Sequence, residues 1–550
     1  MKVKKLLALG ATALLSTFVL AGCGNKSSDS SKSKAPSSTV KIMTKDVIAT
    51  MDSSLNTDVI GSQAATNTME GLYRYEGKTI KPGIATKVVK PTNNGLTYTF
   101  PLRDTKWSNG DPVTADDFVF AWRRTVDPKT KSQYAYIYEG IANAKDITAG
   151  KKSAKTLGVK AVDKHTLQVT LEKPIPYFNK LMTCAFYFPQ NQKVVEKWGK
   201  KYGTNSKTLV FNGPYKLVNW DGTDNTWNEV KNKDYWNAKN VKVKKLQYQV
   251  VKDPTTALNL YQSNKLDDVI ITGDNAKQMR GSKGYNSRKM NSTFYIAPNL
   301  KRQPLFKNKK IRQAISLSIN RPQMTKKVLG DGSQPADSFM PRNMATNPTD
   351  KSKDFVDETK ASAAEYAKYD PKEAKKLWKQ GLAETGNTGK KFNFAMLGDD
   401  TDAAKKLDEF LQNQLEELPG LKVTLNNVPF KTRLSRSDSG DFDMVVTAWN
   451  ADFPDPINFL TLMTSKASYN FGKWKNSKFD DLVDKSMTQD ANDPSKRWQD
   501  MKEAQDVLNK EQGVVPLYQV GEAHMTKSKV KNMTLSPNGS YNMVSVRVNK

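Results

Sequence analysis

The stretch LTYTFPLRDTKWSNGDPVTADDFVFAW (residues 96–122) carries a strand signal followed by a helix signal. Apolar and polar residues alternate between Leu96 and Leu102, which predicts a strand with one buried face. The residues from Thr114 to Asp117 form a capping box, and we expect the helix that it opens to end before Pro128. A strand that leads into a helix in this way indicates an α/β protein.

Strand and helix signals alternate along the rest of the chain, without a repeat of fixed period. Residues 246–251 predict a strand, Asp253-Pro254 opens a helix, and residues 269–272 predict a second strand, so together they form a βαβ-like unit. A helix from Ala403 carries an apolar stripe and leads into a strand at residues 422–425. The stripe consists of Leu407, Phe410, Leu411, Leu415 and Leu418. The fold class that we predict for the whole chain is therefore α/β.

The N-terminus has the pattern of an export signal. Lys2, Lys4 and Lys5 precede an uncharged apolar run at residues 6–20, which is shorter than the roughly 18–20 residues that span a bilayer. The segment Leu20-Ala21-Gly22-Cys23 resembles the lipobox of bacterial lipoproteins, in which the cysteine thiol receives diacylglycerol. An ordinary secretory signal with a chance cysteine is the alternative.

We therefore predict a signal peptide over residues 1–22, lipidation at Cys23 and a flexible Ser/Lys-rich tether over residues 23–38. This arrangement places the mature chain on the extracellular face of the cell membrane, where a lipid anchors it. The composition of the tether favours a Gram-positive envelope.

The chain of 550 residues is strongly basic, with 86 Lys and Arg against 56 Asp and Glu, a formal charge of +30. Export argues against nucleic acid as a partner, and the basic residues are scattered along the chain. Anionic lipid or wall polymers are candidate partners for this charge, and plain solubility explains it equally well.

Catalytic and metal-binding motifs are absent from the sequence. Two histidines and two cysteines are too few for a disulfide scaffold, a zinc finger or a multi-histidine metal centre. We interpret His165, in a turn, and His524 as structural, and Cys184 as a small buried hydrophobe. The acidic pair Asp399-Asp400 fits helix caps or solvated charge. We therefore expect no enzymatic activity, no metal and no cofactor.

The segment Trp449-Asn450-Ala451-Asp452-Phe453-Pro454-Asp455-Pro456 follows a predicted strand at residues 442–448. The strand ends in an aromatic residue, an acid comes shortly after, and two prolines stiffen the exit. An acid at this place could hold a cation while the strand edge pairs with an extended chain. A turn with two helix-capping aspartates is the competing interpretation.

Four blocks of the sequence resemble the extracytoplasmic oligopeptide-binding proteins of ABC importers. The blocks are Leu102–Trp122, Asn212–Tyr215 with Asp234–Asn237, Ile311–Ala314 with Ile319–Arg321, and Trp449–Asp455. Together they extend over essentially the whole mature chain. The resemblance implies a periplasmic-binding-protein-like fold of type II, a large three-lobed clamshell with mixed sheets that closes on its ligand by a hinge.

The resemblance also implies where the lobes lie. Lobe I is discontinuous and takes residues 39–69, 190–291 and 521–550. An inserted lobe takes residues 70–189, and lobe III takes residues 292–520.

Residues of the ligand site follow from the matching motifs. The resemblance implies that Asp452 binds the α-ammonium of a peptide and that Trp449 forms the wall of a side-chain pocket. Backbone groups around Ala448 and Asn450 would pair with the main chain of the peptide. Every peptide offers these groups, so such a site can accept many sequences.

Two further aromatic residues, Tyr134 and Phe430, are implied to line the cleft. The sequence also departs from the family. Asn450 and Ser292 occupy positions at which relatives often have a disulfide, so that bond is missing. Residues 445–447 (Val-Val-Thr) stand where some relatives have arginines that hold the C-terminus of a short ligand, which favours longer or variable peptides.

The leading functional hypothesis is a monomeric, lipid-anchored protein that captures oligopeptides and delivers them to the permease of an ABC importer. A receptor for a signalling peptide on the same fold is a second hypothesis. A secreted hydrolase of peptides or wall polymers is a third, which the missing nucleophile–base set disfavours. An adhesin for anionic polymers is a fourth.

Overall fold

The computed structural model describes residues 38–549. The predicted signal peptide, Cys23 and nearly all of the predicted tether lie outside this range. Within it, the largest sheet has eleven strands. They are β1 (Thr39–Thr44), β7 (Tyr215–Val218), β8 (Thr226–Lys231), β9 (Lys245–Val250), β10 (Asp268–Ile271), β11 (Tyr285–Pro298), β12 (Gln334–Pro335), β13 (Phe392–Asp399), β14 (Leu421–Val428), β15 (Met444–Asn450) and β16 (Val515–Thr526).

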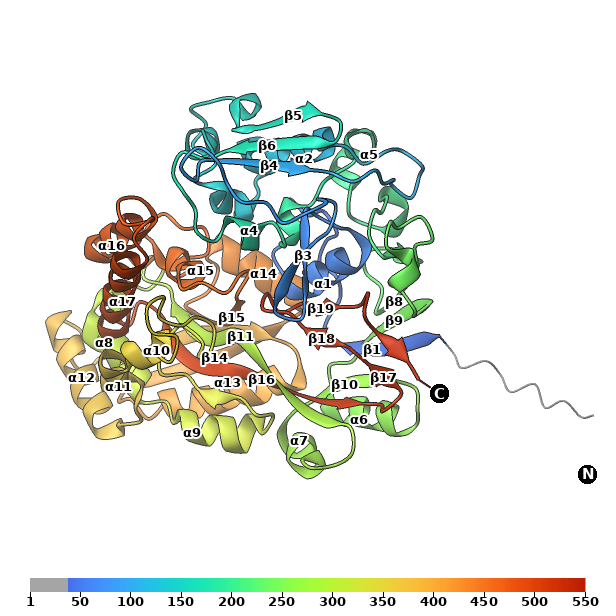
Figure 1. Ribbon diagram of the computed structural model, residues 1–550. Coiled ribbons are helices and arrows are strands. Elements are labelled where there is room, and N and C mark those ends of the chain that lie inside the picture. Colours follow the sequence, from blue (N-terminus) through green and yellow to red (C-terminus); the bar gives the residue numbers. More distant parts are fainter. Residues whose placement is uncertain (1–37, 550) are drawn as a thin grey trace, which may run out of the picture. The chain divides into compact units, whose positions relative to one another are not determined.

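The strand order is β14-β13-β15-β11-β16-β10-β1-β9-β8-β7, with β12 paired to β16 (Figure 1). The two long strands β11 and β16 run antiparallel and connect the two halves of this sheet. The register of the pair shifts between Lys289 and Thr293. Beyond the shift β11 also pairs with β15, whereas the far end of β16 pairs with β10. The sheet is mixed, as the α/β prediction requires.

The predicted strand–helix–strand unit and the predicted helix that leads into a strand are both present. Strand β1 lies between β9 and β10 and is parallel to both. Helix α6 (Pro254–Gln262) connects β9 to β10, and its N-cap Asp253 accepts a hydrogen bond from the Thr256 backbone N–H at 2.6 Å. Helix α13 (Asp402–Leu415) connects the parallel pair β13 and β14. Phe410 is only partly buried at the edge of its apolar stripe.

The stretch at residues 96–122 forms a strand and a helix, as predicted. Strand β4 (Thr97–Pro101) belongs to a three-stranded sheet with β5 (Val159–Asp163) and β6 (Thr166–Thr170). Helix α2 (Ala115–Val126) lies beside this sheet at the top of Figure 1. The Asp117 carboxylate accepts a hydrogen bond from the Thr114 backbone N–H at 2.8 Å, which is one half of the capping box.

Further helices and short strands complete the described residues. The helices are α1 (Val59–Thr68), α3 (Ala144–Thr148), α4 (Phe178–Leu181), α5 (Gln192–Trp198), α7 (Gly273–Met279), α8 (Lys309–Leu317), α9 (Arg321–Gln323), α10 (Phe355–Glu358), α11 (Lys360–Ala367), α12 (Pro371–Glu384), α14 (Phe430–Ser439), α15 (Ile457–Leu460), α16 (Ser477–Met487) and α17 (Pro494–Glu511). The strands are β2 (Tyr73–Glu76), β3 (Thr79–Pro82), β17 (Val530–Lys531), β18 (Thr534–Leu535), β19 (Tyr541–Asn542) and β20 (Arg547–Val548). Two 3-10 helices, η2 (Gln133–Tyr138) and η4 (Ala185–Tyr187), contribute residues to the site.

The core is rich in large aromatic side chains. Trp107, Trp122, Trp227, Trp378 and Trp474 are all fully buried. Burial of such side chains supplies much of the apolar area that stabilises the fold. Between residues 38 and 549, no helix combines the length and the apolar character that crossing a bilayer requires.

Candidate functional site

A cavity of about 450 Å³ lies between segments from both halves of the large sheet. Strands β1, β10, β11, β15 and β16 contribute to its wall, together with helices α1 and α14. The six residues that the sequence indicated for ligand binding all line it. They are Tyr134, Phe430, Ala448, Trp449, Asn450 and Asp452. Their positions agree with the sequence analysis, and their roles stay predictions.

The Asp452 carboxylate is held by two hydrogen bonds. The Tyr134 hydroxyl donates to Oδ1 at 3.0 Å, and the Asn458 amide donates to Oδ2 at 3.1 Å. Burial nevertheless raises the pKa of Asp452 to about 7, because these two bonds only partly offset the loss of water. No cationic side chain within residues 38–549 is among the groups that shift the pKa of Asp452. The site therefore presents an acid that lacks a cation.

Asn458 was not indicated by the sequence, yet it orients the two central residues of the site. Its Oδ1 accepts hydrogen bonds from the Trp449 indole N–H and from the Asp452 backbone N–H, both at 3.0 Å. Its amide N–H donates to the carboxylate of Asp452. One buried amide on α15 thus fixes the tryptophan and the acid relative to each other. No pattern within the single sequence indicates this role.

Aromatic rings surround Asp452. Tyr134, on η2, stacks on Phe186 with ring centroids 4.4 Å apart. Tyr469 contacts Trp449 edge to face at 4.7 Å and lies 5.7 Å from Tyr134. Phe186, in the 3-10 helix η4 (Ala185–Tyr187), and Tyr469, in a turn, were not predicted from the sequence, because neither belongs to a matching motif. The packing around the acid leaves it little contact with water, and this burial raises its pKa.

One edge of β15 is open next to Asp452. On one side the strand pairs with β11 from Met444 to Asn450. On the other side β13 pairs with it only at Met444 and Val445. Within residues 38–549 the remaining length of that edge has no strand partner. Its backbone N–H and C=O groups are therefore free to pair with an extended chain in the cavity.

The cross-strand neighbour of Asn450 on β11 is Ser292. These are the two positions at which the resemblance implied a disulfide in relatives. The structure thus places them opposite each other, with side chains that cannot form that bond. Cys184 is the free cysteine of the described residues.

Phe430 begins α14, and its ring lies 5.0 Å from the Arg433 guanidinium. Arg433 Nε donates to Asp399 Oδ1 at 2.9 Å. Asp399 ends β13, lines the cavity and pairs with the buried Arg433, so it is an ion-pair acid and not a helix cap. A second bond of Arg433 reaches Thr447 Oγ1 at 3.3 Å. The stretch 445–447 has no arginine of its own, but α14 supplies one beside it.

The remaining residues singled out in the sequence have structural surroundings. His165 is exposed in the turn between β5 and β6. His524 is buried on β16, with Nδ1 2.9 Å from Asp268 and Nε2 2.9 Å from Glu522. Cys184 is buried, and burial raises the pKa of its thiol well above the usual range, which makes it unreactive.

A large mixed α/β fold with a cavity between the two halves of its main sheet is typical of solute-binding proteins. The family described as bacterial extracellular solute-binding proteins, family 5, middle, matches residues 79–471, and the chain belongs to this family. It is 35% identical over 564 residues to the dipeptide-binding protein of Lactococcus lactis subsp. cremoris, with all of both chains covered.

Two solved structures have the same fold over almost the whole chain. Listeria monocytogenes OppA bound to peptide superposes with a TM-score of 0.88 at 38% identity, covering 94% of this chain and 100% of that one. The structure of the pheromone receptor PrgZ superposes with a TM-score of 0.88 at 36% identity, and it also covers 94% of this chain and 100% of that one. These findings confirm the type II periplasmic-binding-protein-like α/β fold. Membership of this family also makes the chain a substrate-binding component and not an enzyme.

Proposed function

We propose that this protein captures oligopeptides outside the cell and delivers them to the permease of an ABC importer. The observation that carries the proposal is the unpaired carboxylate of Asp452 beside the open edge of β15. A peptide offers the two complementary groups, a terminal ammonium and a main chain that can add to a sheet. The names of the Lactococcus and Listeria relatives support the same ligand class.

Asp452 binds the α-ammonium of the peptide in this proposal. Tyr134 donates a hydrogen bond to Oδ1 of the carboxylate and Asn458 donates one to Oδ2. The ammonium adds a charge-assisted bond. Trp449 forms the wall of a side-chain pocket, and Phe430 and Tyr134 line the cleft. Because the recognised groups are common to all peptides, the site tolerates varied side chains, with water filling the space that they leave.

The predicted lobes also enter here as a proposal. Lobe I (39–69, 190–291 and 521–550), the inserted lobe (70–189) and lobe III (292–520) would close on the peptide by a hinge. The register shift in β11 after Lys289 is a natural place for that hinge, because ladder pairing is interrupted there. We expect the protein to act as a monomer.

Anchoring is part of the same proposal. The lipobox-like segment before Cys23 supports lipidation, and the tether over residues 23–38 would let the binding protein reach its permease. The location that follows is the extracellular face of a Gram-positive cell membrane. A strongly basic chain, at +30, is compatible with an anionic membrane surface.

A signalling-peptide receptor is the second candidate. The likeness to the pheromone receptor PrgZ favours it, since that structure matches as well as the OppA structure does. The two candidates differ in breadth: a nutrient receptor binds a wide peptide library with similar affinities, whereas a signal receptor binds a few members strongly.

Native mass spectrometry of the purified protein, followed by calorimetry with any peptide that co-purifies, tests peptide capture. We expect the Asp452→Asn variant and an N-acetylated peptide each to lower the affinity by about 2–5 kcal/mol. Asp481→Asn removes an exposed acid outside the cavity and should bind as the wild type does. Equal affinity for free and acetylated peptides would overturn the ammonium clamp.

A further inference from the structure

Buried carboxylate oxygens without a hydrogen-bond partner gather at the cavity. Six such oxygens occur within residues 38–549, and four of them belong to residues that line it: Asp46, Asp58, Glu229 and Asp408. A buried acceptor without a donor is costly, so proteins seldom keep several in one place without a purpose. A ligand that brings donors or a positive charge would satisfy them.

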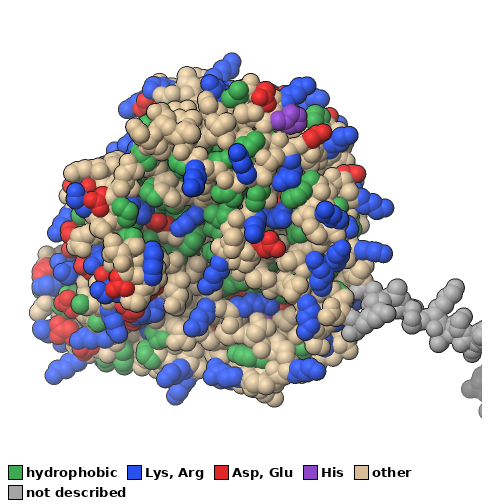
Figure 2. Space-filling model, viewed as in Figure 1, with side chains coloured by type: hydrophobic (Ala, Val, Ile, Leu, Met, Phe, Trp, Pro, Cys, Tyr) green, Lys and Arg blue, Asp and Glu red, His purple; other side chains and the backbone are tan. Residues whose placement is uncertain are grey.

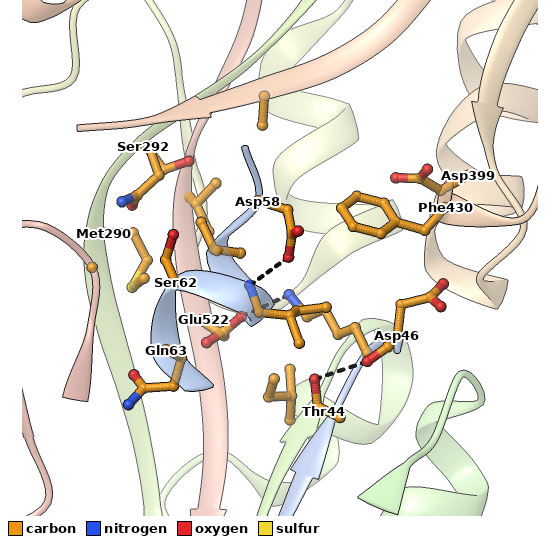
Figure 3. A pocket seen from close by; sticks show the side chains of 18 of the residues that line it. Thr44, Asp46, Asp58, Ser62, Gln63, Met290, Ser292, Asp399, Phe430 and Glu522 are labelled. Carbon is orange, nitrogen blue, oxygen red and sulfur yellow. Dashed lines mark hydrogen bonds and ion pairs between the residues drawn. The ribbon is translucent and has the colours of Figure 1, made fainter. Parts of the chain in front are cut away.

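Asp58 is the most exactly positioned of the four. It is the N-cap of α1, and its Oδ1 accepts hydrogen bonds from the backbone N–H groups of Ile60 at 2.9 Å and Gly61 at 2.8 Å. These bonds fix the side chain and leave Oδ2 without a partner. The side chain is only 6% exposed. Figure 3 shows it on the cavity wall between Phe430 and Ser62.

The other three acids are already compensated. Asp46 has an ion pair with Lys252 at 3.2 Å. Burial raises the pKa of Glu229 to about 8 and that of Asp408 to about 7, so each holds a proton for much of the time near neutral pH. Burial raises the pKa of Asp58 only to about 6, because its two backbone hydrogen bonds and more distant cations oppose the shift.

The cations that act on Asp58 do not pair with it. Arg433 is bonded to Asp399 at 2.9 Å, and Lys431 donates to the Gly222 carbonyl at 2.8 Å. Both lie on α14 and influence Asp58 only through longer-range attraction. Asp58 therefore combines a negative charge at neutral pH with an open acceptor.

The residue types that line the cavity point the same way, even with Lys252 and Arg288, outside the lining, paired to Asp46 and Asp268. Its lining contains ten acidic residues and only two basic ones, Lys45 and Arg433, besides His524. The exterior is the opposite, since Lys and Arg side chains are scattered over the whole face shown in Figure 2. A basic side chain is repelled by the positive charges of the exterior and attracted by the acidic residues of the cavity.

We propose that Asp58 forms a subsite for a basic side chain, Lys or Arg, of the bound peptide. The ammonium or guanidinium group donates to the open Oδ2 and neutralises the acid. This inference rests on the proposed peptide binding. It adds to that proposal a preferred class of peptides, those with a positive charge at one fixed distance from the N-terminus.

Calorimetry with a positional series of peptides tests the subsite. Each peptide has a free N-terminus and alanine throughout, except for one residue that is Lys in one member of a pair and norleucine in the other. Norleucine has the same length without the charge. At one position we expect Lys to bind about 10- to 100-fold more tightly than norleucine, the range for a hydrogen bond to a charged group. At the other positions the pairs should be equal within a few-fold.

Asp58→Asn keeps an acceptor for the two backbone N–H groups and so keeps the N-cap, but it replaces the open oxygen by a donor. In this variant the ratio of Lys to norleucine affinity at that position should fall to near 1. Asp253→Asn is the matched control, because it changes the N-cap aspartate of α6, which does not line the cavity. It should keep the wild-type ratio.

The outcomes separate the two proposals. If both members of every pair bind equally, the basic subsite is wrong while peptide capture stands. If Asp58→Asn keeps the full preference for Lys, the assignment to Asp58 is wrong. If no peptide of the series binds and none co-purifies with the protein, peptide capture itself fails and the subsite fails with it.

Discussion

The Tyr134 hydroxyl donates a hydrogen bond of 3.0 Å to Asp452 Oδ1, across 318 positions of the sequence. Asn458, on helix α15, donates a hydrogen bond to the other carboxylate oxygen, Oδ2. The acid has thus exchanged water for two neutral donors and has no cation. A carboxylate in this condition is prepared for one more ligand, and the most favourable one is a positive charge.

The Tyr134→Phe variant tests this relationship. Loss of the hydroxyl should weaken the binding of a peptide with a free N-terminus by about 1–2 kcal/mol, since a donor to the ionised carboxylate is gone. Tyr136→Phe is the matched control, because the Tyr136 hydroxyl is buried without a hydrogen-bond partner. Calorimetry on both variants decides the point. A similar loss in both would mean that Tyr134 acts through its ring alone.

The pH dependence of binding follows from the pKa of Asp452. In the ligand-free protein burial raises this pKa to about 7, and an ammonium can only bind the ionised form. The affinity should therefore rise about tenfold between pH 5.5 and 7, with protons released on binding. Above about pH 8 the α-amino group of the peptide loses its own proton, and the affinity should fall again.

Calorimetry in two buffers of different ionisation enthalpy measures the released protons directly. At pH 6 the wild type should release close to one proton, and Asp452→Asn should release much less. An affinity that stays flat from pH 5.5 to 7 would show that Asp452 is already ionised without ligand or that it does not contact the ammonium.

Local signals in the sequence predicted the elements well and the site in part. The alternation at residues 96–102 and the caps at Thr114 and Asp253 fix structure through neighbours along the chain, so one sequence suffices to see them. For Trp449 and Asp452 the local pattern left a turn with helix-capping aspartates as a competing interpretation, and their assignment to a ligand site came from the family resemblance.

The partners that complete the site could not be predicted in this way. Asn458 bonds to Trp449 and Asp452, and Asp58 bonds to Ile60 and Gly61, so their contacts are local, but ordinary caps and turns have the same sequence pattern. Asp399 acts through Arg433, which lies 34 positions further along the chain. Asp399 shows the limit clearly: next to Asp400 it suggests solvated charge, and only the approach of Arg433 from α14 makes it part of the cavity. Such contacts depend on the packing of the whole sheet.

A buried ionic cluster contributes to the wall of the cavity. Asp268, on β10, lies 2.8 Å from Arg288 and 2.9 Å from His524. Burial opposes its ionisation, but the charges of His524 and Arg288 outweigh this and lower the pKa of Asp268 to about 2. Because the folded-state pKa is depressed, the stabilisation is present above about pH 4 and is lost as the pH falls toward 2.

Asp268→Asn should lower the free energy of unfolding by about 3–5 kcal/mol at pH 7, since it leaves the buried Arg288 guanidinium without its acid. The difference from the wild type should shrink at pH 3. Urea unfolding at both pH values measures it. Asp274 pairs with Lys277 through an almost fully exposed carboxylate. Asp274→Asn should therefore change stability by less than about 0.5 kcal/mol. A difference that is the same at pH 7 and pH 3 would contradict the role of Asp268.

Membrane attachment should depend on Cys23 and not on Cys184. Two acyl chains on Cys23 would hold the protein stably, because each buried methylene contributes about 0.8 kcal/mol. Cys23→Ser should therefore move the protein from the membrane fraction to the medium, whereas Cys184→Ser, which changes a buried thiol, should leave it attached. Fractions are compared after a wash at high salt, since the charge of +30 alone could bind anionic lipid and salt screens that attraction. Retention of Cys23→Ser through the wash would mean that something other than this lipid holds the protein.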